Sequence, residues 1–369
     1  MTVADAPVIA IDARLVGYAA GIARYTTLLI DALEALGGPE RYLVLRGRRS
    51  KRRTGNTRLL LTPPHHPLER WTLPAEVALT RPSLLHSVDH VAPAWRTWRS
   101  VVTLHDLAFM LYPETQTPAS RAYYAATGES ARRAERVIAV SQRTASDAVR
   151  LLGVEPARVR VVHEAAAPAF SPRTESELEA LAARLGLKVA PRRYALFVGT
   201  LEPRKNVPLL LEAFVQVRRE LDVGLVVVGS RGWLDEPIFA ARARYGLEDS
   251  AQFVGTLDEA DLAVLYSHAG VFALPSLYEG FGLPVLEAMA CGAPVVASNA
   301  GPLPEVAGDA AVLLPPEDAR IWARAMLRVF TDAAQGEELR RRGFARAATF
   351  SWQKAAVATR EAYHEALLA

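Results

Sequence analysis

Residues Pro275–Pro294, PSLYEGFGLPVLEAMACGAP, decide the fold that the sequence predicts. The apolar run Gly270–Leu274 just before them is typical of a strand, and continuous runs such as Leu225-Val226-Val227-Val228 indicate strands that are buried on both faces. A helix is expected to begin near Leu283, because the next residue is proline, which suits a first helical turn where its missing N–H would have no partner. A strand, a glycine-rich turn and a helix in this order form the repeating unit of a parallel sheet covered by helices.

The turn in this stretch carries acidic residues on both sides of a glycine pair. Glu279 precedes Gly280-Phe281-Gly282, and Glu287 follows inside the predicted helix. Glycine lets the backbone approach a ligand closely, and the start of a helix presents free N–H groups and positive potential. The arrangement therefore favours an anion or sugar hydroxyls as ligand. The plainer alternative is that Glu279 only caps the helix and Glu287 faces solvent.

A second motif, VGTLEPRKNV, occupies Val198–Val207 at the expected carboxyl end of another strand. Arg204 and Lys205 precede a predicted helix, and two cations beside a helix N-terminus suit a diphosphate. Lys205 is one of only four lysines among 43 basic residues, so a lysine at this place is less expected by chance. The alternative is a surface Arg-Lys pair without a ligand.

The same alternation of short apolar runs and longer helical stretches extends over the whole chain, which predicts parallel sheets. In the first half, strands are predicted at Val8–Ala13, Tyr42–Leu45, Leu84–Ser87, Val101–Leu104, Arg136–Val140 and Val159–His163. In the second half, they are predicted at Tyr194–Val198, Gly224–Val228, Ala251–Val254, Gly270–Leu274, Pro294–Ser298 and Ala311–Leu314.

The 369 residues correspond to about two domains, at roughly 150 residues per domain. Ser171-Pro172 breaks the chain after Phe170, so we expect a first domain over residues 1–170 and a second over 171–351. Ligands of doubly wound domains bind beyond the carboxyl ends of the strands, so two such domains predict one cleft between them.

Composition excludes several classes of protein. With 50% hydrophobic and 22% charged residues, the chain is neither disordered nor collagen-like. The single cysteine, Cys291, excludes an internal disulfide and a cysteine-rich metal site, which favours a reducing compartment. The N-terminal sequence does not resemble a signal peptide, and no apolar run is long enough to span a membrane. We therefore predict a cytoplasmic protein.

The net charge of 43 − 40 = +3 is unevenly distributed. Arg46–Arg58, RGRRSKRRTGNTR, carries seven basic residues and no acidic one. This segment is either a solvated surface loop or a basic patch that binds an anionic partner. The partner would be an anionic acceptor or anionic membrane lipid, and binding lipid would bring the protein into peripheral contact with the membrane. Nucleic acid is not expected, because no recognition motif accompanies the segment.

Two weaker signals lie in the first half. His105 follows a predicted strand within Thr103–Asp106, and its place at the carboxyl end favours function, although a lone histidine is more often structural. Gly17–Arg24, GYAAGIAR, is a glycine-punctuated loop before a predicted helix, where the backbone can approach a ligand.

Together these motifs resemble the signature of retaining GT-B glycosyltransferases of family 4. The resemblance rests on Gly199–Val207, on Tyr278–Pro294 with its E-x7-E pair Glu279 and Glu287, and on Leu303–Gly308, LPEVAG. Thr103–Asp106 and the Ala139-Val140-Ser141 segment match positions of the first domain, so the resemblance spans essentially the whole chain.

The resemblance implies an α/β fold of two Rossmann-like doubly wound domains that face each other across a cleft. It also implies that the C-terminal helix crosses back, so residues 352–369 would join the first domain. Arg204 and Lys205 would hold the donor diphosphate, and Glu287 the ribose hydroxyls. Glu279, with the backbone of Gly280-Phe281-Gly282, would hold the transferred sugar, and Leu283 would also contact the donor. Thr256 and Leu257 would lie near the base. From the first domain, Gly21 would approach the phosphates or the acceptor, and His105 would border the anomeric carbon.

The chain departs from the family pattern at two places. It reads His163-Glu164-Ala165 where family members often have Pro-Asn-Gly, and Thr200 where many have arginine. Arg204 would substitute for that arginine, or Lys205 would carry more of the phosphate charge.

The predicted activity is transfer of a hexosyl group with retention, first of all mannosyl from GDP-mannose, to a saccharide or lipid-linked acceptor. Attack would take place on the front face, and neither a metal nor a resident cofactor is expected. The open alternatives are a nucleotide-sugar epimerase on the same scaffold and a binding subunit with a decayed site.

Overall fold

The computed structural model describes residues 6–18, 20–50, 55–66 and 68–369. The chain divides into two compact units. Unit 1 comprises Met1–Leu111, Pro118–Glu164 and Ser351–Ala369, and unit 2 comprises Tyr112–Thr117 and Ala165–Phe350. The sequence placed residues 112–117 and 165–170 in the first domain, whereas both segments pack with unit 2.

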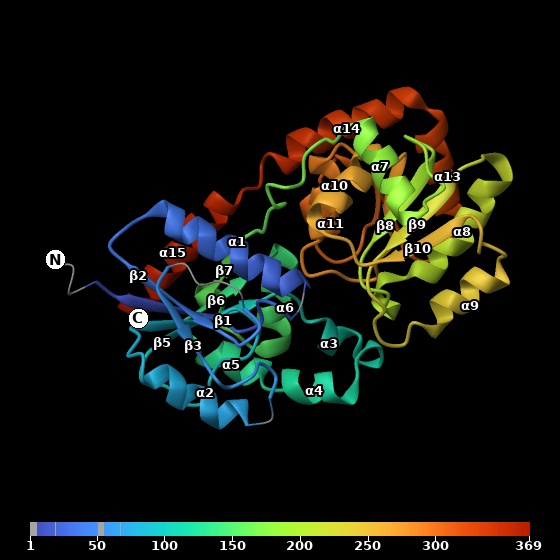
Figure 1. The fold of residues 1–369 in the computed structure, drawn as a ribbon. Helices are drawn as coiled ribbons and strands as arrows, with labels where there is room; N and C mark the ends of the chain where they lie inside the picture. The colour runs from blue at the N-terminus through green and yellow to red at the C-terminus, as the bar shows by residue number, and fades with distance from the viewer. Residues whose placement is uncertain (1–5, 19, 51–54, 67) are drawn as a thin grey trace. The chain divides into compact units, whose positions relative to one another are not determined.

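Unit 1 is built on a parallel seven-stranded sheet in the order β3-β2-β1-β4-β5-β6-β7 (Figure 1). The strands are β1 Val8–Ala13, β2 Arg41–Arg46, β3 Thr57–Leu59, β4 Leu84–Ser87, β5 Arg99–Leu104, β6 Arg136–Ala139 and β7 Val159–Val161. The strand order reverses between β1 and β4, which is where doubly wound domains bind ligands. The sequence did not predict β3, because its three residues are polar or exposed and show no alternation.

The helices of unit 1 are α1 Ala20–Leu36, α2 Glu69–Ala78, α3 Ala108–Leu111, α4 Pro118–Tyr124, α5 Thr127–Arg133, α6 Gln142–Leu152 and α15 Trp352–Leu368. The C-terminal helix α15 belongs to this unit although it is last in the chain. Its Tyr363 hydroxyl lies 2.7 Å from Nδ1 of His86 on β4, and the ring of Trp352 packs 5.9 Å from that of Tyr25 on α1. Helix α2 was not predicted, because Pro74 lies inside it.

Unit 2 contains a parallel six-stranded sheet in the order β10-β9-β8-β11-β12-β13. Its strands are β8 Tyr194–Val198, β9 Gly224–Val228, β10 Ala251–Gly255, β11 Val271–Leu274, β12 Val295–Ser298 and β13 Ala311–Leu314. Every residue of β8 and β11 is buried, as the continuous apolar runs predicted. The order reverses between these two strands, so the loops after them open at one crevice of the unit.

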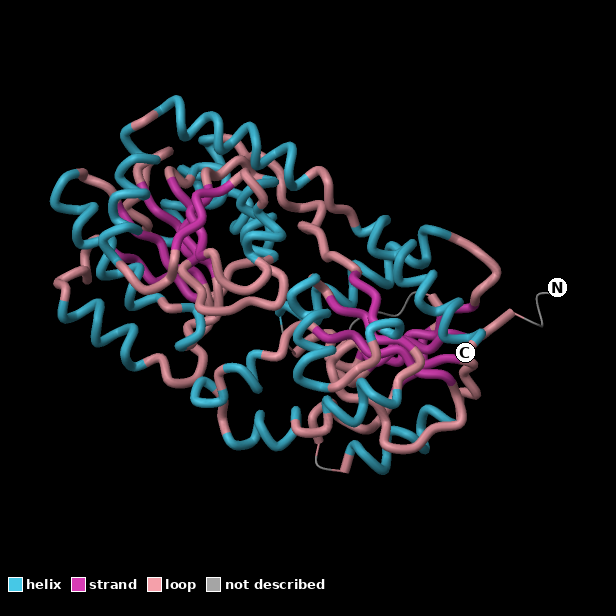
Figure 2. The backbone as a smooth tube through the Cα atoms, turned by 180° about the vertical axis from the view of Figure 1, so that it is seen from behind, coloured by secondary structure: helices cyan, strands magenta, loops and turns pink. Residues whose placement is uncertain are grey.

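The helices of unit 2 are α7 Glu175–Leu185, α8 Val207–Glu220, α9 Glu236–Arg244, α10 Glu259–His268, α11 Leu283–Ala290, α12 Leu303–Ala307, α13 Ala319–Thr331 and α14 Ala333–Ala347. Figure 2 shows that in each unit the magenta strands lie between cyan helices, which is the layering predicted for a doubly wound sheet. Within the described ranges, no helix is both long and apolar enough to cross a membrane.

Candidate active site

A cluster of ionised side chains lies in unit 2, where the loops after β8 and β11 meet. Lys205 Nζ donates hydrogen bonds to both carboxylate oxygens of Glu279, at 2.6 and 2.8 Å. Arg204 donates to Glu279 Oε2 at 3.2 Å and to Glu202 Oε1 at 2.6 Å. Ser276 Oγ donates to Glu279 Oε1 at 2.6 Å. We call Glu202, Arg204, Lys205 and Glu279 the charge cluster; it brings together three residues that the sequence singled out.

Backbone contacts hold the two loops of the charge cluster together. Leu277 N–H donates to the carbonyl of Arg204 at 2.8 Å, and Arg204 Nη1 donates to the carbonyl of Tyr278 at 2.7 Å. Asn206 adopts a left-handed conformation with φ of 53°, which asparagine tolerates well, and its Nδ2 donates to the carbonyl of Pro275 at 3.3 Å. The cluster therefore sits on loops that are fixed to each other.

The charges of the cluster balance. Burial by itself would raise the pKa of Glu279, but Lys205 and Arg204 lower it to about 2, so this carboxylate is ionised at neutral pH. Two cations face two carboxylates, Glu279 and Glu202, within hydrogen-bond distance. An anionic ligand that reaches Lys205 must therefore share it with Glu279 or replace that carboxylate.

The glycine turn begins helix α11 as the sequence predicted. Gly282 is the N-cap residue, and its φ of 106° is a backbone conformation that favours glycine. The buried ring of Phe281 packs against Phe350 at 5.8 Å between centroids. Gly280 is buried beside them, and Leu283 is half-buried as the first residue of the helix.

Glu287 is held on the second turn of α11. Its side chain is almost completely buried, at 2% exposure, and its Oε2 accepts a hydrogen bond from the Tyr266 hydroxyl at 3.1 Å. The alternative in which Glu287 faces solvent is therefore wrong. At the end of β10, Thr256 is exposed and Leu257 is half-buried, after Gly255 with φ of 72°.

In unit 1, His105 lies directly after β5 and has an acceptor at each ring nitrogen. Nε2 lies 2.9 Å from the carbonyl oxygen of Val88, and Nδ1 lies 3.3 Å from Glu164 Oε1. Burial by itself would lower the pKa of the His105 ring, whereas the hydrogen bond and charge of Glu164, together with the charge of Asp89, raise it. Because a carbonyl and a carboxylate both accept, the geometry favours a doubly protonated, cationic ring.

Gly21 lies in the first turn of α1, and its backbone is exposed. A Cβ added there would meet nothing within 4 Å, so packing gives no reason for glycine at this place. Within the loop Gly17–Arg24, Ala19 lies outside the described residues.

Sequence reasoning missed four residues that complete these sites: Glu202, Tyr266, Ser276 and Glu164. The first three bond to residues that the motifs did reveal, but nothing in their own spacing marks them. Glu164 stood out only as a departure from the family pattern. The structure gives it a contact with His105 and places it as the last residue of unit 1 before the chain enters unit 2.

Two sequence profiles match the chain. One, described as "Glycosyl transferases group 1", covers residues 184–346, and another, "Glycosyltransferase Family 4", covers residues 19–168. The O-antigen chain mannosyltransferase B of Escherichia coli is 36% identical over 272 residues, which is 73% of this chain and 71% of that protein. The chain belongs to the family 4 glycosyltransferases.

In two other relatives, the part that aligns with this chain is a smaller share of the relative's own length. The serotype-specific mannosyltransferase WbdA of Escherichia coli is 32% identical over 70% of this chain but only 32% of its own length. The D-inositol 3-phosphate glycosyltransferase of Salinispora arenicola is 33% identical over 64% of this chain and 56% of its length. The chain therefore spans about a third and about half of these two relatives.

Solved structures agree with the GT-B fold that the resemblance implied for this glycosyltransferase. The sucrose-phosphate synthase of Thermosynechococcus elongatus superposes with a TM-score of 0.79 at 25% identity, over 97% of this chain and 98% of that one. Anabaena HepE, solved with UDP and glucose, gives a TM-score of 0.78 at 20% identity, over 97% and 99% of the two chains. The predictions of fold class and of a hexosyltransferase enzyme are confirmed.

Among the described residues of this glycosyltransferase, no group of three or more histidine, cysteine, aspartate or glutamate side chains has a geometry that could hold a metal ion. The lone cysteine, Cys291, is buried, and burial raises the pKa of its thiol to about 12.

We predict that Glu164→Gln lowers the pKa of His105. The substitution removes the carboxylate that raises the pKa, so burial, which lowers it, then dominates. A histidine whose pKa is higher in the folded than in the unfolded protein contributes to stability. This contribution is fully present below the unfolded pKa of about 6.5 and is lost as pH rises through the folded pKa. The variant should therefore lose this stability at a lower pH than the wild type.

NMR titration of the His105 ring checks this prediction directly, with urea unfolding between about pH 5 and 8 as the second measurement. Glu155→Gln serves as control, because Glu155 is an exposed glutamate of the same unit, paired with Arg158. Equal His105 titration curves in wild type and Glu164→Gln would contradict the assigned contact.

Proposed function

We propose that this glycosyltransferase moves a hexosyl group, with retention, from a nucleotide-diphosphate sugar to a saccharide or lipid-linked acceptor. The first candidate for the donor is GDP-mannose. The observation that carries the proposal is the charge cluster at the carboxyl ends of β8 and β11, where Lys205 and Arg204 can bind a diphosphate. The mannosyl assignment is supported by relatives whose names describe mannosyl transfer.

Lys205 and Arg204 would supply the positive charge that donor cleavage needs. When the bond between the anomeric carbon and the phosphate oxygen breaks, negative charge develops on the departing diphosphate, and fixed cations stabilise it. A diphosphate on Lys205 would release Glu279, which can then accept hydrogen bonds from the hydroxyls of the sugar. We therefore propose that neither a metal ion nor a resident cofactor is required.

The remaining donor contacts would follow the family pattern. Glu287, oriented by Tyr266, would accept hydrogen bonds from the ribose hydroxyls, and Thr256 and Leu257 would lie near the base. The backbone of Gly280-Phe281-Gly282 would approach the transferred sugar. With these contacts, the residues that bind the donor would extend from the charge cluster at the diphosphate to the ribose, the base and the transferred sugar.

Unit 1 would contribute His105 near the anomeric carbon and Gly21 near the phosphates or acceptor. In a front-face reaction, the acceptor oxygen bonds to the anomeric carbon on the side from which the diphosphate leaves. The acceptor proton passes to the departing phosphate oxygen, so the transferred sugar forms no covalent intermediate with the enzyme. A cationic His105 would stabilise the anionic diphosphate rather than act as nucleophile.

The epimerase that the sequence left open receives no support. The relatives described above carry the names of transferases or glycosyltransferases, and HepE was solved with UDP and glucose, a nucleotide and a sugar. A binding subunit with a decayed site is likewise disfavoured, because Arg204, Lys205 and Glu279 are all present and in contact.

We predict that Lys205→Met reduces transfer about 100-fold or more, because it removes one charge that stabilises the leaving group. The test is turnover with GDP-mannose and a panel of UDP-sugars, with and without EDTA, and NMR assignment of the anomer formed. Lys188→Met is the matched control, since Lys188 is an exposed lysine of the same unit. Retention predicts an α-linked product from an α-linked donor.

Three results would contradict parts of this proposal separately. Full activity of Lys205→Met would refute the diphosphate site, and an inverted product would refute retention. Loss of turnover in EDTA that added Mg²⁺ restores would refute metal independence.

We also propose that unit 1 contacts the membrane surface through Arg46–Arg58, of which residues 51–54 lie outside the described residues. Arg48, Arg49 and Arg58 are exposed, and the nearby Leu61 is 59% exposed. Basic residues attract anionic lipid, and apolar side chains beside them can enter the interface.

Reversal of two charges, Arg48→Glu with Arg49→Glu, should weaken binding to phosphatidylglycerol vesicles at least about tenfold in a sedimentation assay. Arg324→Glu with Arg328→Glu, on exposed positions of unit 2, makes the same change in net charge and should leave binding unchanged. Equal loss in both variants would show that only net charge matters and would contradict the proposed surface.

A further inference from the structure

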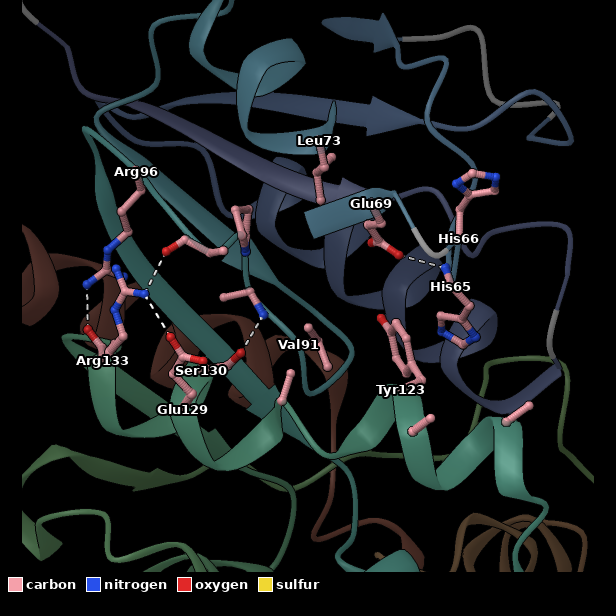
Figure 3. A pocket seen from close by; sticks show the side chains of 16 residues that line it. His65, His66, Glu69, Leu73, Val91, Arg96, Tyr123, Glu129, Ser130 and Arg133 are labelled. Carbon is pink, nitrogen blue, oxygen red and sulfur yellow. Dashed lines mark hydrogen bonds and ion pairs between the residues drawn. The ribbon is translucent and has the colours of Figure 1, made fainter. Parts of the chain in front are cut away.

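Unit 1 contains a mostly apolar trough that the proposed donor site does not use. It has a volume of about 460 Å³ and lies between α2, the loop after β4, and helices α4 and α5 (Figure 3). This volume falls within the range of about 300–1,000 Å³ that is usual for small-molecule sites. The walls are formed largely by Ala92, Pro93, Ala94, Ala119, Ala122 and Ala126. These side chains offer no hydrogen-bonding group, so the walls suit methylene groups.

Charged residues line one end of the trough. Figure 3 shows Arg96, Glu129 and Arg133 together there, and we call them the arginine end. Arg133 Nη1 donates to the carbonyl of Ala94 at 2.6 Å and to Glu129 Oε1 at 3.2 Å. The side chains of Arg133 and Glu129 are 47% and 46% exposed, so their ion pair is weak and an anion from solvent can replace Glu129.

Positive charge exceeds negative charge at the arginine end. Arg96 Nη2 lies 3.1 Å from Glu135 Oε1, and Arg99 Nη1 lies 3.7 Å from the same oxygen, so one carboxylate serves two guanidinium groups. Burial lowers the pKa of Arg96, Glu135 raises it, and the charges of Arg133 and Arg99 lower it further. An anion bound here would reduce the repulsion among the three arginines. Phosphate suits this end, because arginine binds phosphate oxygens in pairs.

The opposite end of the trough is unsuited to an anion. It is lined by Glu69, whose two carboxylate oxygens accept hydrogen bonds from Arg14 at 2.5 Å and from the backbone N–H of His65 at 2.7 Å. Asp89 Oδ2, at 2.9 Å from Nε2 of His65, adds a second carboxylate near this end. A ligand with one anionic group would therefore place that group at the arginine end and its apolar part along the alanine-lined walls.

The arginine end lies near the amino ends of two strands. Arg99, which shares Glu135 with Arg96, is the first residue of β5, and Glu135 directly precedes β6. The proposed transfer takes place beyond the carboxyl ends, where His105 follows β5. An acceptor must bring its head group to the carboxyl ends, so a ligand whose anionic head lies at the arginine end is not the acceptor.

A tryptophan beside the arginine end favours a membrane lipid. Trp95 directly precedes Arg96 and is 39% exposed. Tryptophan is enriched at the level of lipid head groups, where its ring is partly apolar and partly wet. The phosphate of a membrane lipid lies at that same level, with its aliphatic chains directly below.

We propose that the trough binds one aliphatic chain of a membrane phospholipid, whose phosphate lies at the arginine end. The chain would lie along the alanine-lined walls, and the phosphate would bond to Arg133 and Arg96. This site goes beyond the proposed function, because the lipid would be neither donor nor acceptor and would instead hold unit 1 at a membrane.

Calorimetry with monomeric probes tests the site without a bilayer and without a donor. The probes are octyl phosphate below its micelle concentration, methyl phosphate as the head alone, and 1-octanol as the chain alone. The wild type should bind octyl phosphate at least about tenfold more tightly than either of the others, since only this probe reaches both the arginine end and the walls.

Ala122→Trp should abolish the advantage of octyl phosphate over methyl phosphate by filling the trough. Ala125→Trp is the matched control, because Ala125 is exposed near Ala122 and does not line the trough. Both positions are exposed, so neither substitution has to be accommodated in the core.

Two charge variants should change the affinity for octyl phosphate in opposite directions. Arg133→Gln should weaken it at least about fivefold, and Glu129→Gln should strengthen it, while binding of 1-octanol stays the same in both. Arg158→Gln and Glu155→Gln are the matched controls. They make the same changes in net charge in another ion pair of unit 1, with side chains 42% and 62% exposed, and should leave binding unchanged.

Each other outcome overturns the inference. Equal affinity for octyl and methyl phosphate would refute the trough as a chain site, and so would an octyl advantage that survives Ala122→Trp. Equal affinity for octyl phosphate and 1-octanol, or equal effects in the two ion pairs, would refute the arginine end. Competition between octyl phosphate and the acceptor in a transfer assay would identify an acceptor site instead.

The two earlier proposals fail separately from this one. Because the binding assay contains no donor, a lack of transfer activity leaves its result unaffected. Because it contains no bilayer, a failure of Arg46–Arg58 to bind vesicles leaves it unaffected as well.

Discussion

The buried ion pair between Lys205 and Glu279 is the interaction on which the donor-side structure depends. Both residues are less than a tenth exposed, and each charge is tolerated in the interior because an opposite charge lies beside it. Because Lys205 follows β8 and Glu279 follows β11, the pair fixes two loops at the point where the strand order of unit 2 reverses. Arg204 and Ser276 complete the hydrogen bonds of the carboxylate, which makes the arrangement rigid.

This pair also defines how a donor must enter. The charge cluster is balanced before a ligand arrives, so a diphosphate competes with Glu279 for Lys205, and the displaced carboxylate becomes available to sugar hydroxyls. In unit 1, Arg14 pairs with Asp12 and Glu69 just after β1, and His65 lies 2.9 Å from Asp89. In the charge cluster, the charged residues are held in place before a donor binds, which reduces the cost of ordering them.

Much of the fold followed from the sequence, because strands buried on both faces give continuous apolar runs and Gly282-Leu283-Pro284 marks a helix start. Individual motifs also revealed Arg204, Lys205 and Glu279. Contacts between residues distant in sequence could not be predicted, since packing alone brings them together. Examples are His105 with Glu164, and Arg14 with Glu69, separated by 59 and 55 positions. Helix α2 was hidden by Pro74.

The most direct test of the account compares nucleoside diphosphates with the matching monophosphates as ligands. Calorimetry of GDP against GMP, and of UDP against UMP, isolates the second phosphate, which is the group assigned to Lys205 and Arg204. The account predicts that the wild type binds at least one diphosphate about tenfold or more tightly than its monophosphate, and that Lys205→Met loses this difference while Lys188→Met keeps it. Equal affinities of diphosphate and monophosphate in the wild type would contradict the central claim.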